Sequence, residues 1–319
     1  MSVTPALPVA RTTTRGAGDR GPVRPASRKA LSRSRRRGLL LVAPALLLLA
    51  VVFVAPLGVS VWMSLSSWPL LGEHTFIGLD NYTRLLHDPQ VHRALLFTLQ
   101  FALVITPVTV LVGLGLALLV EKRRRGVGLV RTAIFAPVAI GFASASYLFL
   151  ALTNTATGVF GRALVDLGIT ETAVNWLLDP GLAMLLVVIV TVWKTAGFAM
   201  VALMNGLQSI GKDIEDAARV DGAGRLRLLL QIKLPMMRDS IAFALTFTAI
   251  GAFLTFDQFY ILTGGAPNNS TITSVYRIYN TAFTQGQLGY AAAFSLVFLA
   301  FVLVVTATQL VLLRRGADS

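Results

Sequence analysis

Six long apolar runs constrain the fold of this chain more than any other feature of its sequence. They cover residues 39–64, 94–120, 131–152, 181–206, 240–263 and 290–313. A bilayer core about 30 Å thick needs roughly 20 apolar residues in a helix that crosses it, and every run reaches that length. The chain is 55% hydrophobic and only 13% charged, which is unusual for a soluble domain. We therefore predict an all-α membrane protein with six transmembrane helices, the first three of which are expected to be kinked at their prolines, Pro44, Pro56, Pro107 and Pro137.

The basic residues between the runs predict the orientation of the chain. Four segments hold 23 of the 28 Lys and Arg residues, namely 1–38, 121–131, 207–239 and 314–319. The three segments that alternate with them hold only four, and they are 65–93, 153–180 and 264–289. Cytoplasmic segments of membrane proteins carry an excess of Lys and Arg. Both termini are therefore expected in the cytoplasm, and the net charge of +13 reflects this asymmetry rather than a nucleic-acid partner.

The same segments predict three regions. A basic tail (1–38) is rich in Arg, Thr, Gly and Pro, and we expect it to be disordered and to contact anionic lipid headgroups. The membrane domain covers 39–313, and a short cytoplasmic tail covers 314–319. Residues 34–40 loosely resemble a twin-arginine signal. The apolar run that follows has 26 residues, longer than the roughly 7–15 of a signal-peptide core, so an uncleaved helix is expected.

The residue types needed for enzymatic chemistry are scarce. The chain has no cysteine, and its three histidines, His74, His87 and His92, lack the spacing of metal ligands. The apolar runs hold one carboxylate and no histidine, so they supply neither a nucleophile with its base nor a metal site. A membrane enzyme is therefore not expected. A self-contained secondary carrier stays open as an alternative, although it needs coupling groups at mid-membrane.

The loop between the fourth and fifth runs is longer than a helix–helix connection needs, and it predicts two short helices. In the first, Asp213 is the expected N-cap and Asp216 stands at the third helical position. Ile214, Ala217 and Ala218 then form a small apolar face. This helix pair also fits an amphipathic element that lies on the membrane surface without a protein partner.

Two glycines, Gly222 and Gly224, are expected to break the chain between these helices. The second helix is expected to end before Pro235. Its apolar face consists of Leu226, Leu229 and Leu230. The same loop partly matches a phosphate-binding loop at Gly206 and Gly211-Lys212, but an Asp follows where Ser or Thr must bind Mg²⁺, and no strand precedes it. Nucleotide binding by this chain is not expected.

One pattern in this loop resembles a known motif. Asp216-Ala217-Ala218 is followed after three residues by Gly222 and, after nine more, by Ile232-x-Leu234-Pro235. This pattern resembles the EAA loop, which marks the membrane subunits of binding-protein-dependent ABC importers. The family usually has Glu at the position of Asp216 and often has Pro at that of Gly211.

Further segments resemble the branch of that family that imports sugars, whose close relatives carry glycerol phosphates. They are Trp193-Lys194, Leu207–Ile210, Phe256–Tyr260, Leu262–Thr271, Tyr279, Phe283 and Gly289–Ala293. The resemblance covers roughly residues 39–313 and is to the first-type permease. That subunit is similar to the larger membrane subunit of the maltose importer, but here there is no large periplasmic insertion. The resemblance implies the type I ABC importer permease fold.

The resemblance also implies a function and partners. The chain would form half of a translocation pathway for an oligosaccharide or disaccharide, with glycerol phosphate or a related polyol derivative as the alternative solute. A second permease subunit would form the other half, and an extracytoplasmic binding protein would deliver the solute. Two ATPase subunits would use ATP and Mg²⁺, and this chain would bind no cofactor.

The residues implied in coupling to the ATPases lie in the cytoplasmic coupling loop, residues 207–239. They are Asp216, Ala217, Ala218, Arg219, Gly222, Leu234 and Pro235. Small alanines let a helix enter a groove on a partner closely, and Gly222 lets two helices meet at a sharp angle. Asp216 and Arg219 supply charged hydrogen-bonding groups at the rim.

Charges inside the apolar runs suggest where a solute passes, because such groups normally face a cavity or a partner. The candidate pathway residues are Lys194, Asn205, Phe253, Phe256, Asp257 and Tyr260. Four of them, from Phe253 to Tyr260, recur at helical spacing and predict one face with aromatic rings and polar groups suited to a sugar. For each candidate, helix packing or a bond to a neighbouring helix is the alternative role.

Overall fold

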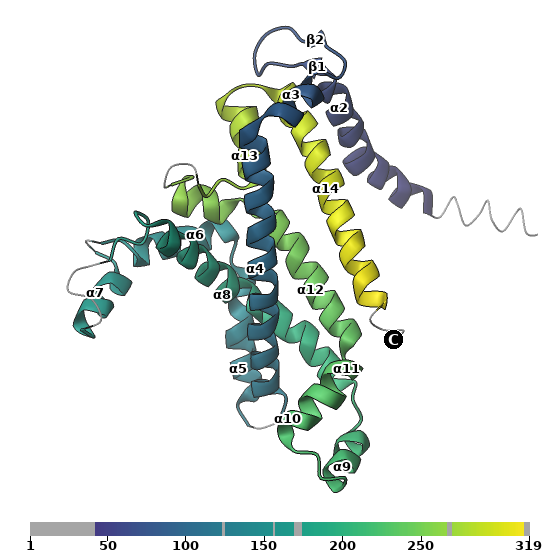
Figure 1. The fold of residues 1–319 in the computed structure, drawn as a ribbon, viewed down its shortest axis with the longest axis vertical. Helices are drawn as coiled ribbons and strands as arrows, with labels where there is room; N and C mark the ends of the chain where they lie inside the picture. The colour runs from purple at the N-terminus through teal and green to yellow at the C-terminus, as the bar shows by residue number, and fades with distance from the viewer. Residues whose placement is uncertain (1–41, 123–124, 156, 169–173, 267–269, 316–319) are drawn as a thin grey trace, which may run out of the picture. The chain divides into compact units, whose positions relative to one another are not determined.

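The computed structural model describes the chain from residue 42 to residue 315, except for 123–124, 156, 169–173 and 267–269. The predicted basic tail and part of the loop after the fifth run therefore lie outside the described residues. Contacts divide the chain into two compact units, one that ends at Leu57 and one that begins at Gly58. The described residues are mostly helical (Figure 1).

The first candidate span is a helix from Val42 to Ser64. It contains a π-helical segment, η1 (Ala50–Val54), followed by α2 (Ala55–Ser64). Pro56 stands at this junction, and because proline has no N–H to donate, it accounts for the change in helix type there. None of the most hydrophobic window of this helix is buried within the structure, which suits contact with lipid.

Four long helices build the second unit, and they are α4 (Pro89–Val120), α8 (Pro180–Gln208), α12 (Arg238–Phe253) and α14 (Leu288–Arg315). α4, α8 and α12 pack against one another, and α14 packs against α12 (Figure 1). Where α4 crosses α8, a Cβ atom added to Gly113 would lie 2.6 Å from the Cβ atom of Ala199. Close crossings at small residues are typical of membrane helices.

Two of these helices begin with the same local arrangement. Asp88 and Asp179 are N-caps whose carboxylates accept hydrogen bonds from backbone N–H groups of the first turn. Pro89 and Pro180 follow them, where the missing N–H of proline has no cost. These caps start α4 and α8 slightly before the apolar runs begin.

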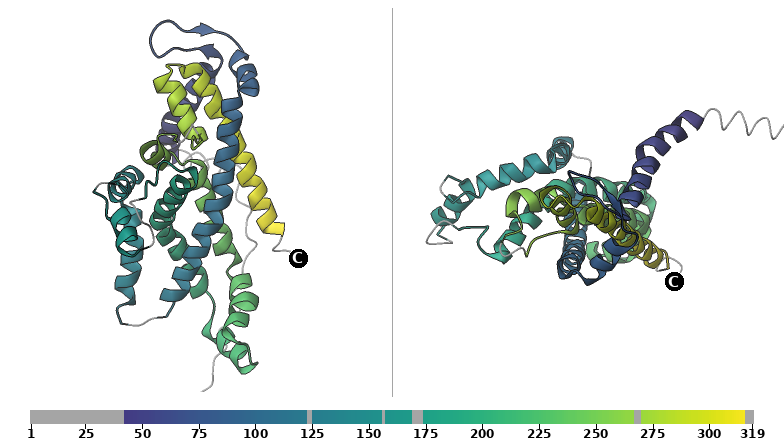
Figure 2. Two further views of the ribbon diagram at one scale, coloured as in Figure 1. Left: turned by 60° about the vertical axis from the view of Figure 1, so that its left-hand side comes forward. Right: turned by 90° about the horizontal axis from the view of Figure 1, so that it is seen from above.

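The run 131–152, predicted as one helix, is a pair of helices bent by 100°. The parts are α5 (Val127–Phe135), the 3₁₀ segment η2 (Ala136–Ala139) and α6 (Phe142–Leu152). Pro137 disrupts the α-helical hydrogen bonds, as expected for a proline in this run, and Gly141 is the N-cap of the next helix, so the expected kink is a complete break. α6 and the short α7 (Val159–Asp166) extend away from the packed pair α4 and α8 (Figures 1 and 2).

The run 240–263 is also interrupted, contrary to the prediction. α12 ends at Phe253, and after a break at 254–256 the chain continues toward the π-helical segment η4 (Phe259–Thr263). Beyond it, α13 (Ser274–Tyr279) and η5 (Asn280–Thr284) lead into α14. The residues on both sides of the break are apolar, so hydropathy does not reveal it.

The coupling loop contains α9 (Lys212–Val220), α10 (Arg225–Arg227), the π-helical segment η3 (Leu228–Lys233) and α11 (Leu234–Met236). The second predicted helix does not stop before Pro235. It continues to Met236, because a proline is tolerated in the first turn of α11, and it then bends by 73° into α12.

At the end of the second unit opposite α9 lie α3 (Asp80–His87) and a hairpin of β1 (Ser66–Ser67) and β2 (Thr75–Phe76) (Figure 1). The amide of Asn81 donates to the carbonyl oxygens of Ser64 and Ser66 at 2.8 and 3.0 Å, and so fastens α3 to the hairpin.

By length and composition, four described helices could each cross a membrane. Two bent pairs raise the number to six if each pair counts as one span. The chain is thus an all-α membrane protein, as predicted, although two of its spans are broken helices.

Candidate functional site

The turn between α9 and α10 is fixed by backbone geometry. Gly222 has φ of +79°, in the left-handed region that glycine adopts without strain. The N–H of Gly222 donates to Arg219 O at 3.0 Å, and the N–H of Ala223 donates to Ala218 O at 2.9 Å. This pair of bonds is a Schellman motif, which ends a helix and redirects the chain. The expectation that the turn requires the conformation of glycine at this position is confirmed.

The start of α9 differs from the prediction. Gly211 is the N-cap, and no side chain caps the helix. Asp213 lies inside the first turn, and Asp216 lies further along than the predicted third position. The acidic residues Asp213 and Glu215 near the N-terminus still suit the helix dipole.

The coupling loop exposes one apolar strip and buries another. Ala218 and Leu228 are buried, whereas Leu226 and Leu230 of the predicted second apolar face are exposed, so that predicted face is not the buried one. Ile214, Ala217 and Val220 are exposed on α9. Exposed apolar groups on a protruding helix are typical of a docking element.

The exposed charges of α9 pair with one another. Arg219 donates to Asp216 Oδ1 at 3.1 Å and to Glu215 Oε2 at 3.2 Å. Asp216 and Arg219 are 68% and 56% exposed, so these bonds contribute little stability and are free to be exchanged for bonds to another protein. Leu234 is half-buried and Pro235 is exposed further along the same loop.

Lys194 lies in the middle of α8 and is buried. Its Nζ donates to Val138 O at 3.4 Å and lies 4.4 Å from the centre of the Phe142 ring. Both contacts are with the bent pair formed by η2 and α6, so Lys194 supports the bend. This is the bond to a neighbouring helix that was the alternative role for this residue.

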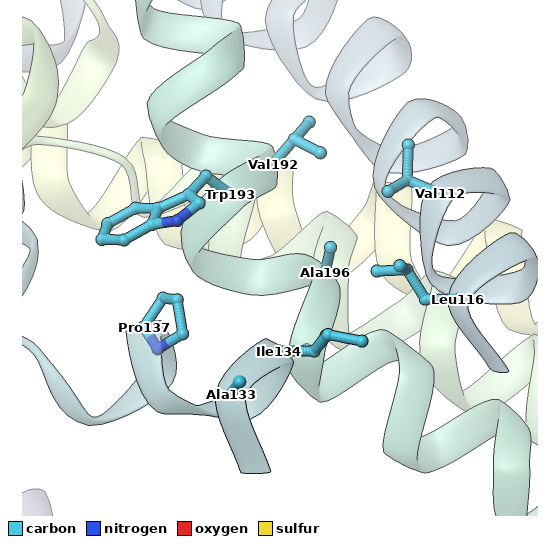
Figure 3. Close-up of a pocket in the computed structure, with 9 residues that line it drawn as sticks. Val112, Leu116, Ala133, Ile134, Pro137, Val192, Trp193 and Ala196 are labelled. Atoms are coloured by element: carbon cyan, nitrogen blue, oxygen red, sulfur yellow. The ribbon is translucent and has the colours of Figure 1, made fainter. Parts of the chain in front are cut away.

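A cavity of about 360 Å³ lies between α4, α5, η2 and α8 (Figure 3). It is lined by Val112, Leu116, Ala133, Ile134, Pro137, Val192, Trp193, Ala196 and Gly197. Trp193 and Pro137 lie side by side at one end of it (Figure 3). The mostly apolar lining makes this cavity poorly suited to a hydroxyl-rich solute.

The four residues predicted to share a helical face do not share one, because α12 ends at Phe253. Phe253 is buried and packs edge-on against Phe301 at 6.0 Å between ring centroids. Phe256, Asp257 and Tyr260 lie beyond the break. Asp257 is half-buried, and no ion pair joins it to another of the described residues.

An aromatic cluster lies beyond the end of α12. Its members are Phe256, Tyr260, Tyr276, Tyr279 and Phe283. Ring centroids in contact lie 5.0 to 6.1 Å apart, and Phe256 stacks on Tyr260 at 5.1 Å. Tyr260 is 42% and Phe283 is 59% exposed, so the cluster offers open ring surface. Asn205 is exposed near the other end of α8, beside the coupling loop, and does not join this group.

Sequence reasoning identified Phe256 and Tyr260 but missed Tyr276, whose ring lies 5.5 Å from that of Tyr260. It also missed the ion pairs of Glu121 and Glu215 with Lys233 in the coupling loop. Among the described residues, no group of three or more His, Asp or Glu side chains could hold a metal ion.

Comparisons with known proteins agree with this geometry. Residues 39–316 match the model of the family described as binding-protein-dependent transport system inner membrane component. The chain is 35% identical to the sn-glycerol-3-phosphate transport system permease protein of Escherichia coli over 287 residues, which is 89% of this chain and 96% of that protein. It is 33% identical to the sulfoquinovosyl glycerol transport system permease protein of Agrobacterium fabrum over 282 residues, 88% of this chain and 91% of that protein.

Among solved structures, a chain of a bacterial alginate ABC transporter in complex with a periplasmic protein bound to an alginate pentasaccharide has the same fold. Its TM-score is 0.79 at 21% identity, over 91% of this chain and 99% of that chain. The relatives are transport components and not enzymes, and the matching family is of the inner membrane. The chain belongs to the inner membrane components of binding-protein-dependent transport systems, and it is a multi-pass permease subunit of the bacterial plasma membrane.

Proposed function

We propose that this chain forms half of the transmembrane pathway of an ATP-driven importer for an oligosaccharide or disaccharide and that the coupling loop joins it to the ATPases. The observation that carries the proposal is α9, an exposed helix with a fixed turn at Gly222, which lies within the part of the chain that matches the family. Both termini are cytoplasmic in this proposal, because the basic segments alternate with poorly charged ones.

The proposed partners follow from this role. A second permease subunit completes the pathway, and two ATPase subunits bind ATP and Mg²⁺, which this chain does not bind. An extracytoplasmic binding protein delivers the solute. The exposed residues Ile214, Ala217 and Val220 would enter a groove on an ATPase subunit, while Asp216 and Arg219 would bond at its rim.

The aromatic cluster supports a carbohydrate as the solute. Sugars present apolar ring faces and many hydroxyls, so they bind well where aromatic rings lie beside carboxylates or hydroxyls. Such groups lie just beyond the break in α12, where the chain carries Phe256, Asp257 and Tyr260. Ligand sites in transporters commonly lie at broken helices, where the irregular backbone borders a cavity.

A phosphorylated polyol is the second candidate solute. It is favoured by the 35% identity to a glycerol-phosphate permease. The two candidates differ in charge, because glycerol phosphate is a dianion near neutral pH and neutral sugars are not.

The test is transport by the complex that co-purifies with this chain, reconstituted in proteoliposomes with ATP inside. Uptake of radiolabelled maltose, trehalose and sn-glycerol 3-phosphate would be measured with and without the binding protein. We expect uptake that requires ATP, the binding protein and the second permease subunit. Uptake by this chain alone, driven by an ion gradient, would instead identify a secondary carrier and overturn the proposal.

A further inference from the structure

Three charged side chains meet where the coupling loop faces the end of α4. Lys233 Nζ lies 2.9 Å from Glu215 Oε1 of α9 and 2.5 Å from Glu121 Oε1, at the C-terminal end of α4. We name Glu121, Lys233 and Glu215 the ion triad. It joins residues far apart in the sequence, because the bent pair and the whole of α8 lie between Glu121 and the coupling loop.

The ion triad is largely shielded from water. The side chains of Lys233, Glu121 and Glu215 are 8%, 21% and 18% exposed. Burial by itself would lower the pKa of Lys233, but the hydrogen bonds and charges of the two glutamates raise it above its usual value. Lys233 therefore stays charged, and its removal would leave the shielded Glu121 without its counter-charge and Glu215 with only the exposed Arg219 as a partner.

The surroundings of the ion triad connect it to the membrane helices. Arg131 of α5 donates from Nε and Nη2 to Val120 O, the residue next to Glu121, at 3.2 and 2.6 Å. Hydrogen bonds thus run from α9 through Lys233 to the end of α4 and on to α5. Along the chain, α9 is attached only to α8 and, through α10 and α11, to α12. The ion triad adds α4 to the helices that a movement of α9 would displace.

The exposed pairs of Arg219 show why the ion triad is different. Among the described residues, Arg219 forms ion pairs within α9 alone and is more than half exposed, so these pairs join no two elements and contribute little stability. Lys233 bonds two separate elements in a shielded position, where breaking one partner has a large effect.

We propose that Lys233 is a positioning residue that makes α9 and the cytoplasmic end of α4 move as one body, so that displacement of α9 by the ATPases reaches α4 directly. This rests on the proposed function, in which ATP-driven closure moves the docked coupling loop. Rigid-body motion of this kind requires a contact that holds in both states.

The chain has no cysteine, so pairs of spin labels can be placed without removing native thiols. Labels at Asp213→Cys in α9 and Leu119→Cys in α4 are at exposed positions outside the ion triad. Their distance would be measured in the complete complex, first without nucleotide and then trapped with ADP and vanadate. We expect one narrow distance that is the same in both states, and the same result in Lys233→Arg.

In Lys233→Gln, the distance distribution should broaden or change between the two states. The matched control is Arg227→Gln, which removes one positive charge from the same helical segment at an exposed position, and it should behave as the wild type. If Lys233→Gln prevents assembly, Glu121→Gln breaks only the α4 side and should give the same broadening. A narrow, unchanged distance in Lys233→Gln or Glu121→Gln would overturn the proposal.

A second readout separates positioning from folding. For whichever of radiolabelled maltose, trehalose or sn-glycerol 3-phosphate the wild-type complex imports, the solute moved per ATP hydrolysed would be measured per assembled complex. We expect Lys233→Gln to lower this ratio by roughly tenfold, a typical size for the loss of coupling between two sites. Lys233→Arg, which keeps the positive charge, should restore it.

An unchanged ratio in Lys233→Gln would contradict the inference. If the wild-type complex imports none of these solutes, the proposed carbohydrate function fails instead, and the distance measurements still decide the role of the ion triad.

Discussion

Two sharp changes of direction, one at Gly222 and one at the end of α12, are stabilised in different ways. At Gly222 the chain turns in an exposed loop, and the bonds that hold the turn are two backbone hydrogen bonds within α9 and its cap. Everything needed for this turn lies within six consecutive residues. Side chains from other elements are not required.

At the end of α12, by contrast, the break is held by residues from other parts of the chain. Thr273 Oγ1, which also caps α13, donates to the carbonyl oxygen of Thr255 at 3.0 Å. The amide of Gln258, almost fully buried, donates to the hydroxyl of Thr191 in α8 at 3.4 Å. Where α12 ends, polar groups without a helical partner are thus hydrogen-bonded by tertiary contacts, as a membrane interior requires.

The two regions should therefore respond differently to substitution. The turn at Gly222 depends on one backbone angle and should tolerate most changes around it. The break after Phe253 depends on several buried hydroxyl and amide groups, and each of them should matter.

The largest expected effect is that of Gly222→Pro. Proline holds φ near about −65°, far from the +79° at this position, and it removes the N–H that donates to Arg219 O. We expect the protein to insert and assemble but to lose import, while the ATPases continue to hydrolyse ATP. Transport and ATP hydrolysis by reconstituted complexes provide the measurement.

The matched control is Gly224→Pro, because Gly224 already has φ of −68°, which proline adopts without strain. It should import at nearly the normal rate. Normal import by Gly222→Pro would show that the turn is not needed for coupling.

The second effect tests whether the break borders the solute pathway. Asp257→Ala should raise KM for the imported sugar by roughly tenfold or more, since hydrogen bonds to charged groups contribute about 1.5–3 kcal/mol. Asp239→Ala, which removes a carboxylate that is 99% exposed at the start of α12, is the control and should have no such effect. Uptake with unchanged affinity and unchanged rate in Asp257→Ala would remove this residue from the pathway.

Local rules explain which parts of the fold could be predicted. The apolar runs located the long helices, since about 20 apolar residues in sequence have few structures open to them in a membrane. Gly222 was predictable because a helix end commonly requires a left-handed residue. A kink at Pro137 was predictable because proline removes a backbone donor. The break after Phe253 was not, because apolar residues lie on both sides of it and the compensating bond comes from Thr273, outside the apolar run.

The candidate sites divide in the same way. Asp216 and Arg219 could be placed on an exposed helix face from their spacing alone. The contact of Lys233 with Glu121 could not be predicted, because the two residues lie 112 positions apart in sequence. For Phe253, helical spacing misled the prediction, since the spacing is meaningful only while the helix continues.

A smaller effect is expected for Thr273→Val, which changes the break without touching the solute pathway. It removes the bond to Thr255 O and the N-cap of α13, and it should destabilise the complex by about 1–3 kcal/mol. Thr308→Val in α14 is the control, because the hydroxyl of Thr308 donates to Val304 O of its own helix and not to another element. The measurement is the Tm of both variants in detergent, and equal values would mean that the break does not depend on Thr273.

The smallest expected effect is a pH dependence at the far end of α4, another long-range contact. The Tyr290 hydroxyl of α14 donates to Asp88 Oδ2 at 2.8 Å, and the N–H of Gln90 donates to Oδ1 at 2.8 Å. Burial opposes ionisation, but these hydrogen bonds and the charge of Arg277 together lower the pKa of Asp88 below its usual 3.8. A carboxyl whose pKa is lowered by folding stabilises the native state above pH 3.8, and this contribution is lost as the pH falls through the folded value.

We therefore expect the Tm of the wild type to fall more steeply than that of Asp88→Asn on acidification from about pH 6 to about pH 3. Asparagine keeps one carbonyl oxygen to accept from the N–H of Gln90, its NH2 group can donate to the Tyr290 hydroxyl, and it does not titrate, so the difference in pH dependence between the two curves reports the carboxylate. Parallel curves would show that the contact between α4 and α14 does not depend on this charge. The turn at Gly222 is held by backbone hydrogen bonds, which contain no titrating group. Its contribution to stability should therefore stay constant over the same pH range, unlike that of the long-range contact between α4 and α14.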